Sequence, residues 1–165
     1  MNPSESSIAY LDEAPASLPK AAKEALAAFG PRYSEHHGDR AVLVDRAHWL
    51  AAVTALKEAG YTWFVDHTAV DYPARTPRFT VVVILQDPDT QDRLIVKTRA
   101  AEGESVASLS SLWDAANWAE RETWDMYGVP FEGHPDLTRI YMPQDYEGHP
   151  MRRDFPLQGH LRFQD

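Results

Sequence analysis

Residues 113–128 read WDAANWAERETWDMYG, and this stretch decides how the chain is built. Ser111 or Asp114 can begin a helix here, and the apolar spacing continues to about Tyr127. We therefore predict one regular helix that runs to about Tyr127.

The predicted helix carries aromatic side chains on more than one side. One face holds a mostly aromatic stripe made of Trp113, Ala116, Glu120, Trp124 and Tyr127. Trp118 lies on a different face, and Arg121 and Asp125 are spaced to pair with each other. A core helix with a solvated charged face would explain part of this pattern. The aromatic content on two faces favours a helix packed between the chain's own sheet and another protein.

After Gly128 no periodicity continues to Asp165, because proline and glycine recur every few residues. Apolar residues nevertheless recur along the same stretch: Phe131, Leu137, Ile140, Tyr141, Met142, Tyr146, Met151, Phe155 and Leu157. A disordered tail would lack such content, and a long irregular segment is usually functional or ordered by a partner. We predict that residues 128–165 form an extended strap that wraps a partner.

Two adjacent cations, Arg152 and Arg153, lie in the part of the strap that Pro150 and Pro156 hold extended. Paired arginines flanked by apolar residues suit docking into a carboxylate-lined groove on a partner. In the alternative, the strap folds back and one of the arginines pairs with the chain's own acids. The two interpretations are compatible.

The residues before this region predict an α+β domain. The expected helices cover residues 17–29 and 47–59, and the expected strands cover 41–44, 61–70, 78–85 and 93–98. Asp87-Pro88-Asp89-Thr90 predicts a turn that joins the last two strands as an antiparallel hairpin. We expect a mainly antiparallel four-stranded sheet covered by helices. The domain would span residues 1–127, with residues 1–16 loose.

Composition excludes several functional classes. The chain of 165 residues has 16 Lys and Arg against 25 Asp and Glu, a net charge of -9 that disfavours nucleic acid and anionic lipid as partners. Without cysteine, disulfides, thiolate catalysis and cysteine-bound clusters are excluded within this sequence. The longest apolar run, Thr80–Leu85, is far shorter than a membrane-spanning helix, so we expect no direct membrane insertion.

Candidate catalytic and metal sites are weak. Seven histidines are present, but none stands in a spacing typical of a zinc or calcium site. No phosphate-binding glycine loop and no serine nucleophile elbow occur. We therefore expect no catalytic, cofactor-binding or metal-binding residue. A stand-alone metal-dependent hydrolase that uses His134, Asp136 and His149 is the remaining enzymatic alternative.

Three segments in order resemble a known family. These are residues 116–128 (ANWAERETWDMYG), 134–140 (HPDLTRI) and 147–157 (EGHPMRRDFPL). Together they are similar to the 30-kilodalton subunit family, also called the C subunit, of proton-translocating NADH-quinone oxidoreductase, respiratory complex I. The resemblance is nearly continuous from Ser111 to Leu157. The first hundred residues resemble the family only in the order of helices and strands.

The resemblance implies a structural peripheral-arm subunit without a cofactor of its own, on the cytoplasmic side of the cell membrane. Iron–sulfur clusters and FMN would be bound by partner subunits. The chain would support the quinone-reducing module during electron transfer from NADH to quinone, which is coupled to proton translocation. Its tail would wrap the large quinone-site subunit, also called the D subunit, beside neighbouring iron–sulfur subunits.

The matched motifs also imply a set of partner-contact residues. These are Glu120, Arg121, Glu122, Trp124, Asp125, His134, Asp136, Arg139, His149, Arg152, Arg153 and Asp154. Related subunits occur in membrane-bound hydrogenases and plastid-type dehydrogenases, so a complex with another electron donor is a second possibility.

Overall fold

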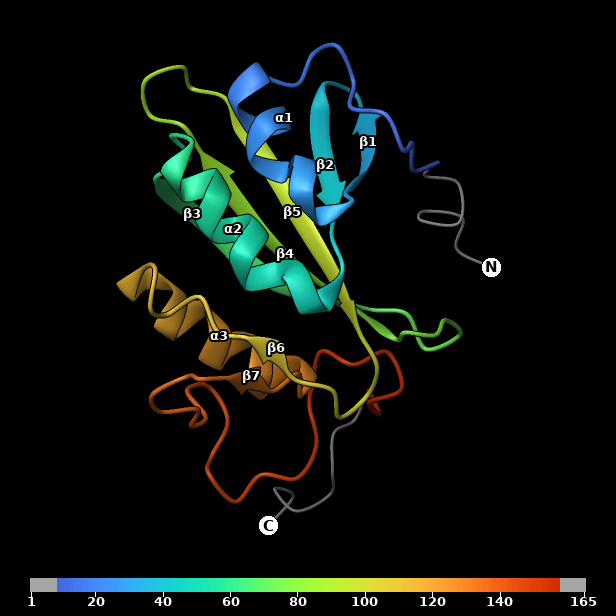
Figure 1. Ribbon diagram of the computed structural model, residues 1–165. Coiled ribbons are helices and arrows are strands. Elements are labelled where there is room, and N and C mark those ends of the chain that lie inside the picture. The colour runs from blue at the N-terminus through green and yellow to red at the C-terminus, as the bar shows by residue number, and fades with distance from the viewer. Residues whose placement is uncertain (1–8, 158–165) are drawn as a thin grey trace. The chain divides into compact units, whose positions relative to one another are not determined.

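The chain is a mixture of helices and strands, and this computed structural model describes residues 9–157 (Figure 1). The helices are α1 (Lys20–Leu26), α2 (Trp49–Glu58) and α3 (Asp114–Tyr127), with short 3-10 helices η1 (Ala27–Phe29) and η2 (Arg46–His48). The strands are β1 (Arg32–His36), β2 (Asp39–Leu43), β3 (Trp63–Asp71), β4 (Phe79–Gln86), β5 (Arg93–Ala100), β6 (Val106–Ala107) and β7 (Phe131–Glu132).

The fold divides into two compact units. Unit 1 holds the chain up to Asp66 together with Val83–Thr98, and unit 2 holds His67–Val82 together with the chain from Arg99 onward. Residues 128–157 of the strap belong to unit 2, as does α3.

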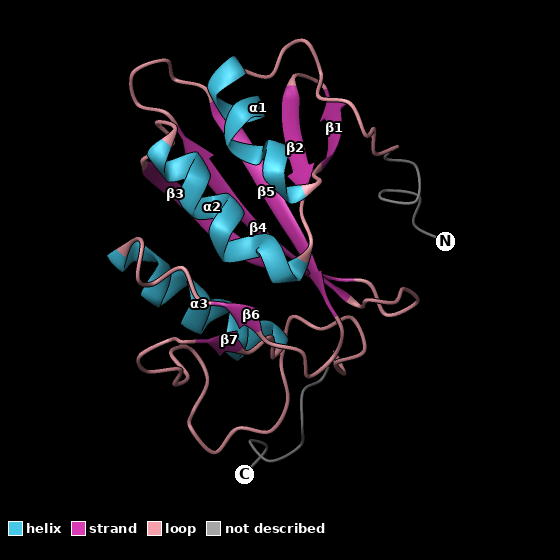
Figure 2. Cartoon of the chain, viewed as in Figure 1, coloured by secondary structure: helices cyan, strands magenta, loops and turns pink. Residues whose placement is uncertain are grey.

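In unit 1, α1 and α2 lie across one face of the sheet (Figures 1 and 2). Helix α2 buries Trp49, Ala52, Val53 and Leu56 completely, at the three- and four-residue spacing of one helix face. Each large side chain buried in this way stabilises the fold by roughly 1.5–3 kcal/mol. Leu50, which helical spacing also assigns to the apolar positions of this helix, is 36% exposed.

The prediction of four strands in the sheet is wrong, because the sheet has five in the order β1-β2-β5-β4-β3. The missed strand, β1, reads RYSEH and buries only Tyr33 and Ser34. An edge strand needs few apolar side chains, so its sequence shows little alternation. His37 and Gly38 connect β1 to β2 with positive φ angles of 51° and 89°, as a two-residue hairpin turn requires.

The expected α+β class is confirmed, with a mixed and mostly antiparallel sheet. β1 pairs with β2 antiparallel, whereas β2 pairs with β5 parallel. The parallel pair sets Ala41 opposite Ile95 and Leu43 opposite Lys97. Parallel neighbours need a long connection, and here the chain forms α2, β3 and β4 between the two strands.

In unit 2, α3 ends at the residue that the periodicity predicted, and Gly128 follows it with φ of 74°. The buried positions on α3 are Ala116, Glu120, Thr123 and Asp125, so two of its acids lie in the interior. The chain after β7 is loop throughout as far as Leu157 (Figure 2). Among residues 9–157, no helix has both the length and the apolar content to cross a membrane.

Candidate interaction site

Asp125 joins α3 to the strap. Its side chain is completely buried, and Oδ1 accepts a hydrogen bond from Nη1 of Arg139 at 2.5 Å. Oδ2 accepts the backbone N–H groups of three consecutive strap residues, Ile140, Tyr141 and Met142, at 3.1, 2.8 and 3.0 Å. One carboxylate therefore satisfies four donors from the strap, which fixes residues 139–142 against the helix.

The Arg139 side chain is nearly buried and also bonds within unit 2. Only 8% of its side chain is exposed, and Nη2 donates to the carbonyl oxygens of Tyr146 and Gly148 at 2.9 and 3.0 Å. Its guanidinium also lies over the rings of Trp124 and Tyr146. The same cation thus holds the later turn of the strap as well as Asp125.

The electrostatics of this pair favour the charged forms. Burial alone raises the pKa of the Asp125 carboxyl, but the N–H groups of Met142 and Tyr141 and the Arg139 guanidinium outweigh it. The pKa of Asp125 is therefore held below its ordinary value. A buried ion pair with all its hydrogen bonds satisfied is costly to break from one side only, at about 3–5 kcal/mol.

The strap also caps the C-terminal end of α3, where helix carbonyl groups lack partners within the helix. The carbonyl oxygen of Asp125 accepts from Nδ1 of His149 at 3.0 Å, and that of Met126 accepts the N–H of Met151 at 3.0 Å. The carbonyl oxygen of Tyr127 accepts Nε of Arg152 at 2.6 Å. Burial and the nearby arginines lower the pKa of His149, which favours the neutral ring.

Position 128 requires glycine, because the strap lies closely against the C-terminal end of α3. A Cβ atom at this position would collide with the His149 ring and with the Arg152 guanidinium. The left-handed backbone conformation at Gly128 would in addition strain any other residue.

A second ion-pair cluster anchors the far end of the strap. Asp71 at the end of β3 is buried and accepts Nε and Nη2 of Arg78 at 2.7 and 2.9 Å. It also accepts the backbone N–H of Arg153 at 2.9 Å. Burial raises the pKa of Asp71, but the hydrogen bonds from Arg78 and Arg153 outweigh it and lower the pKa.

Two exposed acids complete this cluster. Asp154 pairs with Arg78 at 2.9 Å, and its pKa is lowered by that hydrogen bond. Glu102 pairs with Arg152 at 2.6 Å and with Arg78 at 3.1 Å. Asp154 and Glu102 are 57% and 55% exposed, so these outer pairs are weaker and sensitive to salt.

Glu120 lies in a separate, neutral pocket of unit 2. Its carboxyl accepts the hydroxyl of Ser108 and the N–H of Leu109, both at 2.6 Å. Complete burial raises the pKa of Glu120 to about 7, and these two hydrogen bonds only partly oppose it. Among the described residues, no cation lies within ion-pair distance of it.

The remaining predicted residues surround the middle of α3. Arg121 donates to the carbonyl and hydroxyl oxygens of Thr138, so it does not form the expected pair with Asp125. Glu122 is exposed and accepts the hydroxyl of Tyr141 at 3.4 Å. His134 donates from Nε2 to the carbonyl oxygen of Asn117 and accepts the N–H of Asp136 at Nδ1.

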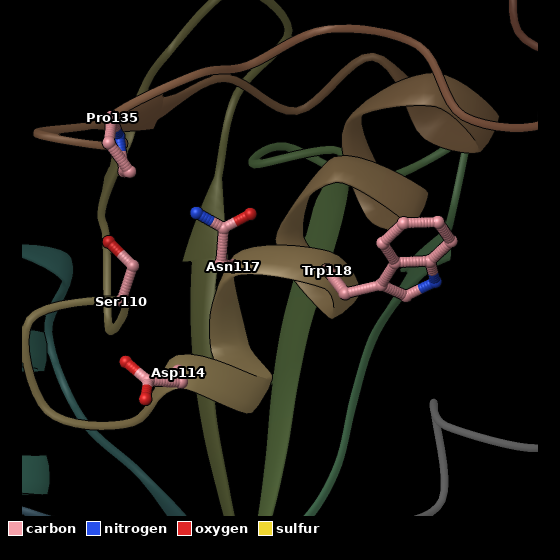
Figure 3. Close-up of a pocket in the computed structure, with 5 residues that line it drawn as sticks. All are labelled: Ser110, Asp114, Asn117, Trp118 and Pro135. Atoms are coloured by element: carbon pink, nitrogen blue, oxygen red, sulfur yellow. The ribbon is translucent and has the colours of Figure 1, made fainter.

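A pocket of about 390 Å³ lies at the start of α3 and is lined by Ser110, Asp114, Asn117, Trp118 and Pro135. Figure 3 shows the other side chains around a common space, whereas the Trp118 indole points away from it. Asp114 is the only carboxyl group among these lining residues, so the pocket lacks the acid–base pair typical of hydrolytic sites.

The structure gathers most of the predicted residues in one region of unit 2, but it does not gather the proposed metal ligands. Within residues 9–157, no three His, Asp or Glu side chains are placed to hold one metal ion. The rings of His134 and His149 hydrogen-bond to different backbone groups of α3. This geometry does not favour the metal-dependent hydrolase.

Three residues that hold the far end of the strap, Asp71, Arg78 and Glu102, are not among the predicted contact residues. Asp71 and Arg78 flank the proline-marked connection between β3 and β4, and their opposite charges there were the available signal. Nothing in the sequence connects Asp71 to Arg153 or Arg78 to Asp154, because each pair is separated by more than about seventy positions.

Known proteins are similar to this chain over α3 and the described part of the strap. The profile of the family "Respiratory-chain NADH dehydrogenase, 30 Kd subunit" matches residues 42–161. The NADH-quinone oxidoreductase C subunit of Citrifermentans bemidjiense is 41% identical over 128 residues, covering 76% of this chain and 80% of that protein. The C/D protein of NADH-quinone oxidoreductase from a Sulfurihydrogenibium species is 45% identical over 133 residues, covering 78% of this chain but 23% of that longer protein.

Two solved structures share the fold. The trypsin-resistant fragment of Nqo5 superposes with a TM-score of 0.62 and 31% identity, covering 70% of this chain and 95% of the fragment. A chain of the membrane-bound sulfane sulfur reductase, an archaeal respiratory membrane complex, has a TM-score of 0.71. It is 22% identical and covers 82% of this chain and 83% of its own length, so it supports the fold alone.

Proposed function

Because this chain belongs to the 30-kilodalton subunit family of respiratory-chain NADH dehydrogenase, we propose that it is a structural subunit of an NADH-quinone oxidoreductase. In this role it supports the quinone-reducing module and provides no redox group. The observation that carries the proposal is the family match over residues 42–161, which includes α3 and the strap as far as residue 161.

We propose the large quinone-site subunit as the direct partner. The Sulfurihydrogenibium relative is named for both C and D as one protein, and fusion keeps two chains at high effective concentration. The iron–sulfur clusters and FMN of the electron path would then be bound by neighbouring subunits. The complex would lie on the cytoplasmic side of the cell membrane, with this chain peripheral to it.

Seven of the twelve predicted contact residues are either nearly completely buried or clearly exposed. Asp125 and Glu120 are completely buried, and Arg139 nearly so; these three stabilise unit 2 itself. The exposed members are Glu122, Asp136, Arg153 and Asp154. We propose that the exposed members contact the partner directly and that the buried members hold the strap in position for it.

The names of the curated relatives favour NADH as the electron donor of the complex over a hydrogenase-type donor. The sulfane sulfur reductase likeness does not separate the two, since at 22% identity it reports the fold alone.

Purification of the tagged full chain from its host membranes checks the proposal. We expect the large quinone-site subunit and the cluster-bearing and flavin-bearing subunits to co-purify, as identified by mass spectrometry, and the purified material to oxidise NADH with a quinone. Recovery of the tagged chain alone, or with a hydrogenase and no flavoprotein, would contradict it.

A further inference from the structure

The arginines of the strap are not equivalent. Residues 128–157 contain three arginines and no lysine. The side chains of Arg139 and Arg152 are only 8% and 17% exposed, and both donate to carbonyl and carboxyl oxygens of unit 2. The guanidinium of Arg153 is exposed and has no hydrogen-bond or ion-pair partner among residues 9–157.

The backbone at Arg153 is nevertheless fixed on both sides. Its N–H donates to Oδ2 of the buried Asp71. The side chain of Arg152 before it is bound to the α3 terminus, and that of Asp154 after it is bound to Arg78. An exposed arginine on an anchored backbone loses less conformational freedom on binding than one on a free loop.

Apolar side chains are exposed close to Arg153 in the chain. Met151 is 55% exposed, and Leu157 is fully exposed at the end of the described residues. An arginine beside apolar side chains is the composition that protein interfaces enrich.

We propose that Arg153 is the cation of the strap that docks on the partner, and that the partner presents a carboxylate set among apolar side chains. The proposal rests on the proposed function, because it names the chemistry of the same interface. The planar guanidinium matches a carboxylate with two parallel hydrogen bonds. Binding to an anionic membrane would instead require a cluster of about 4–8 cations. The chain has a net charge of -9, and the described part of the strap has one arginine whose guanidinium is unpaired.

Substitutions of the two neighbouring arginines separate docking from folding. In the tagged full chain, Arg153→Ala should lower the amount of the large quinone-site subunit recovered per tagged chain by about tenfold or more, with an unchanged melting temperature of the purified chain. Arg153→Lys should recover an intermediate amount, because lysine keeps the charge but not the fork. Arg152→Ala should lower the melting temperature, because its bonds lie within unit 2.

The matched control is Arg93→Ala, which removes an exposed arginine of β5 in unit 1 and should leave recovery unchanged. If the unsubstituted chain recovers the large quinone-site subunit and Arg153→Ala recovers as much, the docking proposal is wrong while the proposed function stands. If the unsubstituted chain recovers no partner, both are wrong. A melting temperature lowered by Arg153→Ala as far as by Arg152→Ala would also overturn the docking proposal.

Binding to lipid vesicles distinguishes a protein partner of Arg153 from a membrane surface. The purified chain should bind phosphatidylglycerol vesicles no better than phosphatidylcholine vesicles. Preferential binding to phosphatidylglycerol that is lost in Arg153→Ala would replace the partner carboxylate with a lipid surface.

Discussion

Glu120 and Asp125 are both completely buried acids of α3, yet their pKa values shift in opposite directions. Asp125 receives three backbone N–H groups and a guanidinium, which keep its pKa below the ordinary value. Glu120 receives one N–H and one hydroxyl, and its pKa rises to about 7. Both acids are buried, so the number and charge of the donors decide the direction in which each pKa shifts.

The raised pKa of Glu120 makes the stability of the chain depend on pH. The folded pKa of about 7 lies above the ordinary value of 4.5, so the neutral form is favoured in the folded state. This contribution is fully present below about pH 4.5 and is lost as the pH rises through 7. Between pH 5 and pH 8 the loss amounts to roughly 2–3 kcal/mol.

Comparison with Glu120→Gln isolates this contribution, because glutamine cannot ionise. Its amide oxygen can accept the N–H of Leu109, and its amide N–H can donate to the hydroxyl oxygen of Ser108. Urea unfolding at pH 5, 6, 7 and 8 should show the variant gaining stability relative to the unsubstituted chain as pH rises. The difference cancels the contributions of His67 and His149, whose lowered pKa values act in the opposite direction. A difference that stays constant with pH would show that Glu120 is ionised in the folded state throughout.

At the level of single residues, this contrast could not be predicted from the sequence. Glu120 and Asp125 belong to the same charged run of the sequence. Of these two acids, only Glu120 falls within the aromatic stripe by helical spacing. Their donors come from Leu109 and from residues 139–142, which are distant in sequence. Which acid meets which donor depends on the tertiary fold.

At the scale of elements, α3 and the strap complete each other. The helix provides a buried carboxylate and three uncapped carbonyl groups, and the strap provides the donors for all of them. The strap has no regular secondary structure of its own between β7 and Leu157, so these bonds replace the ladder that would otherwise satisfy its backbone.

Asp125→Asn should therefore destabilise unit 2 by about 3–5 kcal/mol, because it leaves the buried Arg139 without its counter-charge. Urea unfolding and trypsin cleavage after Arg139 report the loss. Glu122→Gln is the matched control on the exposed side of the same helix, and it should change stability by less than about 0.5 kcal/mol.

A double variant tests whether the effect belongs to the pair. Adding Arg139→Met to Asp125→Asn should cost less than the sum of the two single changes, because the second change removes the uncompensated charge. Additive costs would mean that the two side chains stabilise the fold independently.

The elements differ in how well they could be predicted from the sequence, for physical reasons. The prediction that α3 runs to about Tyr127 is confirmed, because the aromatic spacing behind it is a local signal. Strand β1 is missed, since an edge strand with two buried side chains scarcely alternates. Proline and apolar content predict a partner-wrapping strap, but the pairs that fold residues 139–154 onto unit 2 are long-range and leave no local pattern.

At the scale of the whole molecule, Asp71 is the point where three segments of unit 2 meet: the end of β3, the start of β4 and the strap. Asp71→Asn should release the strap residues near Arg153 while the β1–β2 hairpin of unit 1 stays protected. Loss of the buried charge should speed amide hydrogen exchange around residues 149–155 by at least about tenfold.

Hydrogen exchange with mass spectrometry resolves the two units in one measurement. Asp145→Asn is the matched control, since it changes an exposed acid of the strap with no partner among the described residues. Equal acceleration in both units would show that Asp71 supports the global stability of the chain and not the strap alone.

A substitution at Gly128 provides a genetic test of the contacts between the strap and α3. With His149 and Arg152 in place, position 128 has no room for a methyl group. In a saturation library selected for respiratory growth, alanine at 128 would survive only alongside changes that free the strap from α3. Second-site suppressors of Gly128→Ala would then identify, one position at a time, the contacts that keep this segment closed in the living cell.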